Sequence, residues 1–88
     1  QNYPNPFNPE TVIHYSLSNP GVVPVSLHIY DIAGRRVATL VDGEIGPGAY
    51  QATWHGRNDD GLGVPSGVYF SRLTVGDRSM SRKLLFLK

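Results

Sequence analysis

The fold of this chain is decided by the stretch Val23-Pro24-Val25-Ser26-Leu27-His28-Ile29-Tyr30-Asp31. Within it, Val25, Leu27 and Ile29 alternate with Ser26, His28 and Tyr30. Successive side chains of an extended backbone point to opposite sides, so this period of two predicts a β-strand with one buried face.

The same alternation recurs in other stretches that are separated by glycine- and proline-rich turns. These stretches are Thr11–Leu17, Ala49–His55 and Val68–Val75, and two further strands are predicted at Arg36–Val41 and Met80–Leu87. Ten glycines and seven prolines leave no helical period between them. The pattern predicts an all-β fold, an antiparallel β-sandwich of about seven short strands. The irregular Arg36–Val41 is expected at a sheet edge.

Turn residues join these predicted strands. Asn19-Pro20-Gly21 fits a type II turn, in which the glycine takes a positive φ. Asp31-Ile32-Ala33-Gly34 fits a type I turn closed by a left-handed Gly34, and Gly76-Asp77 fits a two-residue hairpin. A longer loop opens at Asn58-Asp59-Asp60-Gly61 and ends at Pro65-Ser66-Gly67, so Gly34 and Gly67 are predicted to be structural.

The 88 residues fit one domain, predicted as a single module over 1–88. Its first part, 1–9, has three prolines and is expected to form an extended arm, with Tyr3 and Phe7 fastening it to the core. Trp54, Tyr50 and Tyr69 are the predicted large core residues. Tyr69 is placed like a tyrosine corner, whose hydroxyl bonds back to the chain.

The composition argues against several kinds of partner and site. Eight basic and seven acidic side chains give a formal charge of +1, which argues against nucleic-acid binding. The absence of cysteine excludes disulfides and thiolate metal sites. No run approaches the ~20 apolar residues of a membrane span.

Two sets of polar residues are candidate metal sites. His14, His28 and His55 all fall on the non-core faces of their strands, so solvated side chains are favoured over a metal triad. Asn58-Asp59-Asp60-Gly61 resembles a fragment of a calcium loop but lacks the alternate spacing and the downstream glutamate. A polar turn is favoured there, and weak calcium binding with Glu44 or Asp42 stays open.

No catalytic constellation is visible in the sequence. Ser16 and Ser66 do not sit in a strand–turn–helix elbow, and Gly46-Pro47-Gly48 precedes no helix that would cradle a phosphate. The chain is therefore predicted to be non-catalytic and to need no cofactor.

Several motifs, in order and spacing, cover nearly the whole chain. They are Asn2-Tyr3-Pro4-Asn5-Pro6-Phe7-Asn8-Pro9, Ile29-Tyr30-Asp31 with Gly34-Arg35, Gly48 with Trp54 and Gly56, Pro65-Ser66-Gly67-Val68-Tyr69-Phe70 with Arg72-Leu73, and Lys83 before an apolar strand. This pattern resembles the C-terminal sorting domain of the type IX secretion system. It is also similar to the immunoglobulin-like (Ig-like) domain of the flagellar hook-capping protein. Both resemblances imply an Ig-like sandwich.

The sorting resemblance implies a C-terminal domain of a larger exported protein, which passes through the periplasm to the cell surface. It places the signal in the last strands, and secretion machinery would bind Lys83, Leu84, Leu85, Phe86, Leu87 and Lys88. An exposed terminal strand is also a physical template for strand addition, and Arg78, Arg82, Lys83 and Lys88 give it a basic character.

Two other functions compete with sorting. The first is a structural module that self-assembles into a filament or hook-cap-like subunit by strand exchange or edge pairing. In this alternative, the N-terminal arm or the last strand inserts into a neighbouring copy. The second is a carbohydrate-binding module that uses Tyr30, which is disfavoured because one tyrosine is a poor stacking platform.

Overall fold

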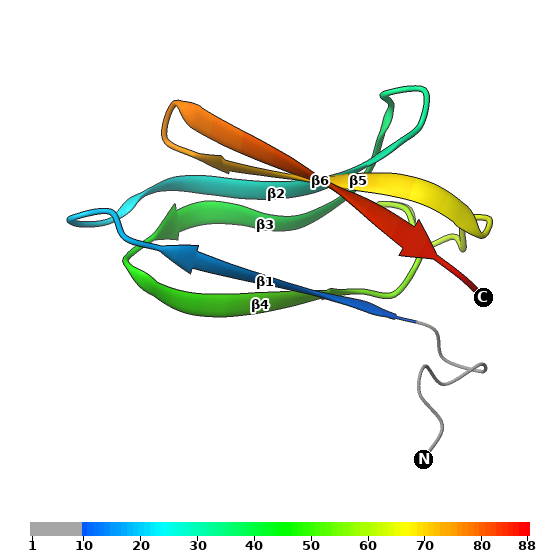
Figure 1. Cartoon of the computed structure of the whole chain (residues 1–88), viewed down its shortest axis with the longest axis horizontal. Helices are drawn as coiled ribbons and strands as arrows, with labels where there is room; N and C mark the ends of the chain where they lie inside the picture. Colours follow the sequence, from blue (N-terminus) through cyan, green and yellow to red (C-terminus); the bar gives the residue numbers. More distant parts are fainter. Residues whose placement is uncertain (1–9) are drawn as a thin grey trace, which may run out of the picture.

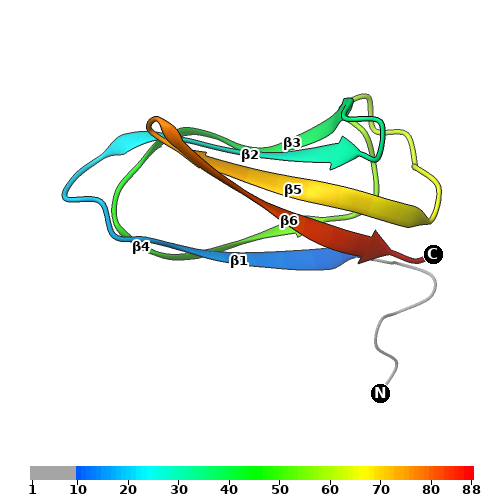
Figure 2. The same ribbon diagram turned by 45° about the horizontal axis from the view of Figure 1, so that its top comes forward.

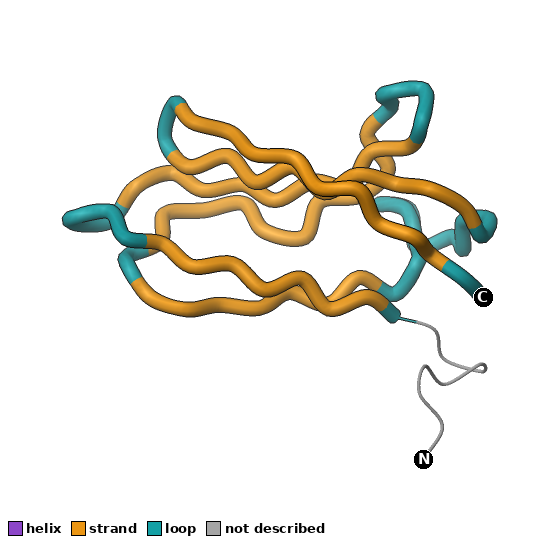
Figure 3. The backbone as a smooth tube through the Cα atoms, in the orientation of Figure 1, coloured by secondary structure: helices purple, strands orange, loops and turns teal. Residues whose placement is uncertain are grey.

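The computed structural model describes residues 10–88, and all regular structure in this range is β-strand (Figure 3). The strands are β1 (Thr11–Leu17), β2 (Val23–Asp31), β3 (Arg36–Ile45), β4 (Gly48–Trp54), β5 (Gly67–Val75) and β6 (Arg78–Phe86). They form two antiparallel sheets, ordered β1-β4 and β3-β2-β5-β6, which face each other in Figure 1. The all-β, Ig-like sandwich prediction is confirmed. Residues 10–88 contain no helix long and apolar enough to cross a membrane.

The number of strands differs from the prediction, because the described residues form six strands rather than about seven. Between β4 and β5, a stretch of sequence long enough for another strand holds only one isolated bridge, Arg57 to Gly63. Its turn residues bond to one another instead: the Asn58 N–H donates to the Leu62 carbonyl oxygen at 2.8 Å. The predicted N-terminal arm, 1–9, with Tyr3 and Phe7, lies outside the described residues.

The core fills the space between the inner faces of the two sheets. Its buried apolar residues are Ile13, Leu17, Val25, Leu27, Ile29, Ala38, Trp54, Val64, Tyr69, Leu73 and Phe86. These residues follow the predicted alternation in β1, β2 and β5. Tyr50, which was expected in the core, is only half-buried and stacks on Tyr15 with ring centroids 5.5 Å apart.

An aromatic cluster of three residues joins the two sheets at one end. Trp54 from β4 contacts Tyr69 from β5 and Phe86 from β6, each with ring centroids 5.0 Å away. Trp54 and Phe86 are each only 2% exposed. The Trp54 indole N–H donates to the Arg57 carbonyl oxygen at 3.0 Å, and the Tyr69 hydroxyl donates to the Pro65 carbonyl oxygen at 2.7 Å. The second bond has the geometry of the predicted tyrosine corner.

The turns agree with the sequence at two positions and differ at one. Gly34 has φ +82°, and its N–H donates to the Asp31 carbonyl oxygen. Gly76 has φ +61° within the tight β5–β6 hairpin. The type II turn predicted at Asn19-Pro20-Gly21 is wrong, because Gly21 does not take a positive φ. The Asn19 side-chain amide instead donates to the Gly21 carbonyl oxygen, so a side chain closes this loop.

Several strand ends also differ from the prediction, most of all in β3 and β6. β3 is an edge strand as expected, but it runs to Ile45 because Gly43 and Glu44 continue to pair with β2. β6 begins at Arg78 and ends at Phe86, so Leu87 and Lys88 lie beyond the strand.

The closest approach in the aromatic cluster predicts that Gly56 tolerates no side chain. A Cβ at Gly56 would stand 1.9 Å from Phe86 Cζ, and its φ of +71° lies in the left-handed region. We expect Gly56→Ala to lower the free energy of unfolding by about 2–5 kcal/mol, because overpacking and left-handed strain add. Urea denaturation followed by Trp54 fluorescence measures this change.

Gly43→Ala is the matched control, because nothing lies within 4 Å of a Cβ at that position. We expect it to change the free energy of unfolding by less than about 0.5 kcal/mol. Equal effects of the two substitutions would contradict the close packing of Phe86 on Gly56.

Candidate protein interface

The three histidines lie apart in the structure. His14 is exposed on β1, and His28 is half-buried on β2 with its Nδ1 3.0 Å from Thr39 Oγ1. His55 is exposed, with its Nδ1 3.7 Å from Glu10 Oε1. Within residues 10–88, no three histidine, aspartate or glutamate side chains come together closely enough to hold a metal ion.

The loop at Asn58–Gly61 is a hydrogen-bonded turn. Asn58 Oδ1 accepts from the backbone N–H groups of Asp60 and Leu62, each at 3.0 Å. Asp59 reaches the edge of β3, because its Oδ1 accepts from the Thr39 N–H at 2.8 Å. Its own N–H donates to the Val37 carbonyl oxygen at 3.0 Å. These oxygens therefore hold the loop against β3, as expected of polar turn residues.

Asp31 organises the turn between β2 and β3. Its Oδ1 accepts from the Ala33 and Arg35 backbone N–H groups, and its Oδ2 lies 3.0 Å from Arg35 Nε. The Arg35 N–H bond holds the pKa of Asp31 below its usual value, and the charge and side-chain bond of Arg35 act in the same direction. The motif residues Asp31, Gly34 and Arg35 thus shape a turn.

The predicted sorting strand does not present one uniform surface. Phe86 is buried in the core and Leu84 is half-buried, whereas Lys83, Leu85, Leu87 and Lys88 are exposed. Register with Phe70 and Val68 places Lys83 and Leu85 on the outer face of the sheet. The Lys88 N–H donates to Ser66 Oγ at 2.9 Å, which fastens the chain beyond β6.

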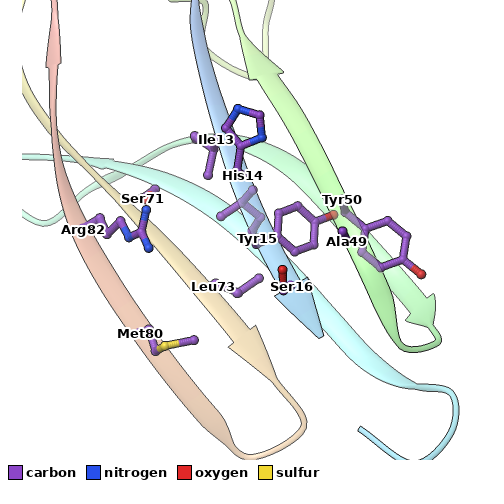
Figure 4. A pocket seen from close by; sticks show the side chains of 11 residues that line it. Ile13, His14, Tyr15, Ser16, Ala49, Tyr50, Ser71, Leu73, Met80 and Arg82 are labelled. Atoms are coloured by element: carbon purple, nitrogen blue, oxygen red, sulfur yellow. The ribbon is translucent and has the colours of Figure 1, made fainter. Parts of the chain in front are cut away.

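A groove of about 510 Å³ opens between β1 and the β5–β6 pair (Figure 4). Ile13 and Tyr15 from β1 face Leu73, Met80 and Arg82 across it. The sequence predicts Arg82 only as one of several basic residues on the last strand, and it does not predict this groove. Counting back in twos from the buried Phe86 would have placed Leu84, Arg82 and Met80 on the inner face.

Comparison with known proteins identifies the family. Residues 10–78 match the FlgD Ig-like domain. The chain belongs to the FlgD Ig-like domain family. Two curated relatives are the basal-body rod modification protein FlgD of Salmonella typhimurium and that of Salmonella typhi. Each is 40% identical over 53 residues, which cover 60% of this chain and 23% of the relative, and no solved structure matches.

The family assignment separates the two resemblances. The similarity to the flagellar Ig-like domain is confirmed, whereas the comparisons do not show a type IX sorting domain. The FlgD Ig-like match ends at Arg78, so Lys83 to Lys88 lie outside it. The chain spans about a quarter of the length of its FlgD relatives.

In the Asn58–Gly61 loop of this FlgD Ig-like domain, the bond from the Thr39 N–H to Asp59 predicts that Asp59 stabilises the fold. We expect Asp59→Ala to lower the free energy of unfolding by about 1–2 kcal/mol, because the Thr39 N–H loses its charged acceptor. Asp60→Ala, which removes the neighbouring carboxylate, should have a smaller effect. Thermal denaturation of both variants measures the difference, and a larger loss for Asp60→Ala would contradict the assigned contact.

The lowered pKa of Asp31 predicts how stability depends on pH. A carboxyl group whose pKa is lower in the folded state stabilises the fold above the unfolded pKa of about 4 and loses this contribution as pH falls through the folded pKa. The free energy of unfolding should therefore fall more steeply between about pH 5 and about pH 2 in the parent chain than in Asp31→Asn. Asp77→Asn in the β5–β6 turn is the control, and denaturant titrations across this range test both. Parallel curves for parent and Asp31→Asn would contradict the assignment.

Proposed function

We propose that this chain is a non-catalytic structural module of an exported, FlgD-type assembly, in which it acts through contacts with other protein chains. The observation that carries the proposal is the family match over residues 10–78, supported by 40% identity to FlgD. This corresponds to the assembly function inferred as an alternative from the sequence.

The geometry supports a role in protein contacts. Side chains fill the interior between the sheets, while both outer faces and the edge strands β1 and β6 remain accessible. The polar residues considered for chemistry have structural partners: His28 contacts Thr39, Asp59 bonds to β3 and Asp31 holds its own turn. Catalysis would need these groups to converge, and they lie on separate elements.

Sorting by a type IX system is the second candidate. The observation that favours it is β6, an edge strand with Lys83 and Leu85 exposed on its outer face. Because Phe86 is anchored in the core, a receptor would have to bind β6 in place rather than detach it. A sorting receptor would accordingly contact the outer face of β6.

The structural proposal predicts that this domain can replace its counterpart in a relative. In Salmonella typhimurium FlgD, we expect a chimera that carries residues 10–88 in place of the matching segment to restore swimming to a strain without FlgD. A chimera that also carries Gly56→Ala should restore less, because its domain unfolds more readily. Swimming-halo diameter and electron microscopy of the flagella measure restoration.

A reporter fused to residues 1–88 distinguishes the two candidates. In a host with a type IX system, the structural proposal predicts that the reporter does not reach the surface. Surface display of the reporter, together with a protease-resistant chimera that fails to restore swimming, would contradict the structural proposal and establish sorting.

A further inference from the structure

The sandwich is closed along one side and open along the other. On the closed side, Gly46-Pro47 links β3 directly to β4, and Asp59 bonds to the β3 edge. On the open side, β1 and β6 each pair with one neighbour within residues 10–88. Figure 2 shows β6 crossing the stack diagonally and separating from β1 toward its Arg78 end.

The inner face of β6 is consequently uncovered at that end. Met80 is in register with the buried Leu73, which places it on the inner face, yet it is 63% exposed. Arg82 is in register with Ser71, a buried residue whose small side chain leaves room beside it. The exposure of this inner-facing methionine indicates that the two-stranded β1-β4 sheet lacks a third strand that would cover it.

The space beneath this face is a continuous groove. The cavity of about 510 Å³ between Ile13 and Arg82 shares Ser16 and Met80 with a second cavity of about 620 Å³, which extends to Arg78. We call the combined space the edge groove; it is lined by Ile13, Tyr15, Leu73, Arg78, Met80 and Arg82. It follows the free edge of β1.

We propose that the edge groove binds an extended peptide segment of a partner protein, which adds to β1 as a third strand and places an acidic side chain against Arg82. The proposal rests on the proposed function, because it names the surface through which the module contacts its partner. An added strand would pair with the N–H and C=O groups along the side of Thr11–Leu17 that faces away from β4, where residues 10–88 supply no other strand. Thr11–Leu17 contains no proline and no lysine, two residues that commonly protect a sheet edge from pairing.

Charge complementarity sets the chemistry of the partner segment. Arg78 and Arg82 both line the edge groove, and the ion pairs within residues 10–88 involve neither of them. The inward positions of the added strand would meet Leu73, Met80 and Tyr15, so apolar side chains suit them. One inward carboxylate opposite Arg82 would complete a charge-assisted hydrogen bond.

A second folded copy does not fit as the occupant through its own β1. The inner face of β1 is already covered by the four-stranded sheet of its own sandwich, as the burial of Ile13 and Leu17 shows. The occupant must therefore have a free face, as an extended segment does.

Inward-pointing charges on an edge strand can also act only as protection against unwanted pairing. That role requires a charge at position 82 but gives no preference between acidic and basic ligands beyond net charge. Recognition therefore predicts two things that simple protection does not. The edge groove should prefer an acidic strand, and this preference should depend on a basic residue on the inner face of β6 rather than on the outer face.

Peptides of defined pattern test the proposal on the full 88-residue chain. The probes are the capped peptides Thr-Val-Thr-Glu-Thr-Val-Thr and Thr-Val-Thr-Lys-Thr-Val-Thr. Met80 is the one methionine of the chain, so a ¹³C-methyl methionine label reports the edge groove through a single NMR signal. We expect the glutamate peptide to shift this signal and the β1 amides, and to bind about tenfold more tightly than the lysine peptide.

Two variants separate position from net charge. Arg82→Glu should reverse the peptide preference, whereas Lys83→Glu makes the same charge change on the outer face and should keep it. The proposal is overturned if both variants behave alike, if the shifts map to the outer face, or if neither peptide binds at millimolar concentration.

Three further outcomes show whether the chain occupies its own edge groove, and whether the groove proposal or the proposed function is the one that fails. Contacts from the Tyr3 or Phe7 rings to the Met80 methyl group without peptide would mean that the chain fills its own groove, which overturns a partner segment. Loss of peptide binding in Arg82→Glu with full swimming of the Arg82→Glu chimera would overturn this role for the groove and leave the proposed function intact. Failure of the parent chimera, with peptide binding as expected, would contradict the proposed function alone.

Discussion

The packing of Phe86 against Trp54, over the bare backbone of Gly56, is the interaction on which the rest of the structure depends. It is the point where the last strand of the large sheet contacts the small sheet, and both rings are almost fully buried. Burying two aromatic side chains contributes several kcal/mol, roughly the net stability of a small domain. The same contact fixes one end of β6 and leaves its Arg78 end over open space, so core packing creates the edge groove.

The sequence predicted the elements whose faces are set by local alternation. β1, β2 and β5 have the expected inner faces, and the turns at Gly34 and Gly76 follow from a glycine where φ must be positive. β3 was predicted too short, because Gly43 and Glu44 have low strand propensity and extend only through pairing with β2. Local propensity does not contain that long-range pairing. The turn expected at Gly21 was wrong for a local reason, because the Asn19 side chain bonds to the Gly21 carbonyl oxygen two residues on.

The candidate interface was only partly accessible from the sequence. The family resemblance directed attention to the last strand and to Lys83, but the face of each side chain depends on register with β5. Sheet order matters equally, because the groove exists only if β1 and β6 lie on the same open side. Sequence alternation places Arg82 and Phe86 on one face, yet it cannot show that Phe86 is covered while Arg82 is not. That difference arises because β6 separates from β1 toward its Arg78 end (Figure 2).

A charged residue on the inner face of an edge strand is costly to cover unless the covering strand brings the opposite charge. Arg82 therefore acts against most strands that approach the open side, including those of other copies, and favours the few with a matching carboxylate. Met80 and Leu73 beside it supply apolar contact that is independent of charge. Met80 and Leu73 thus contribute affinity for a partner strand, and Arg82 discriminates between strands by their charge. This division allows an open sandwich edge to accept a partner strand without aggregating.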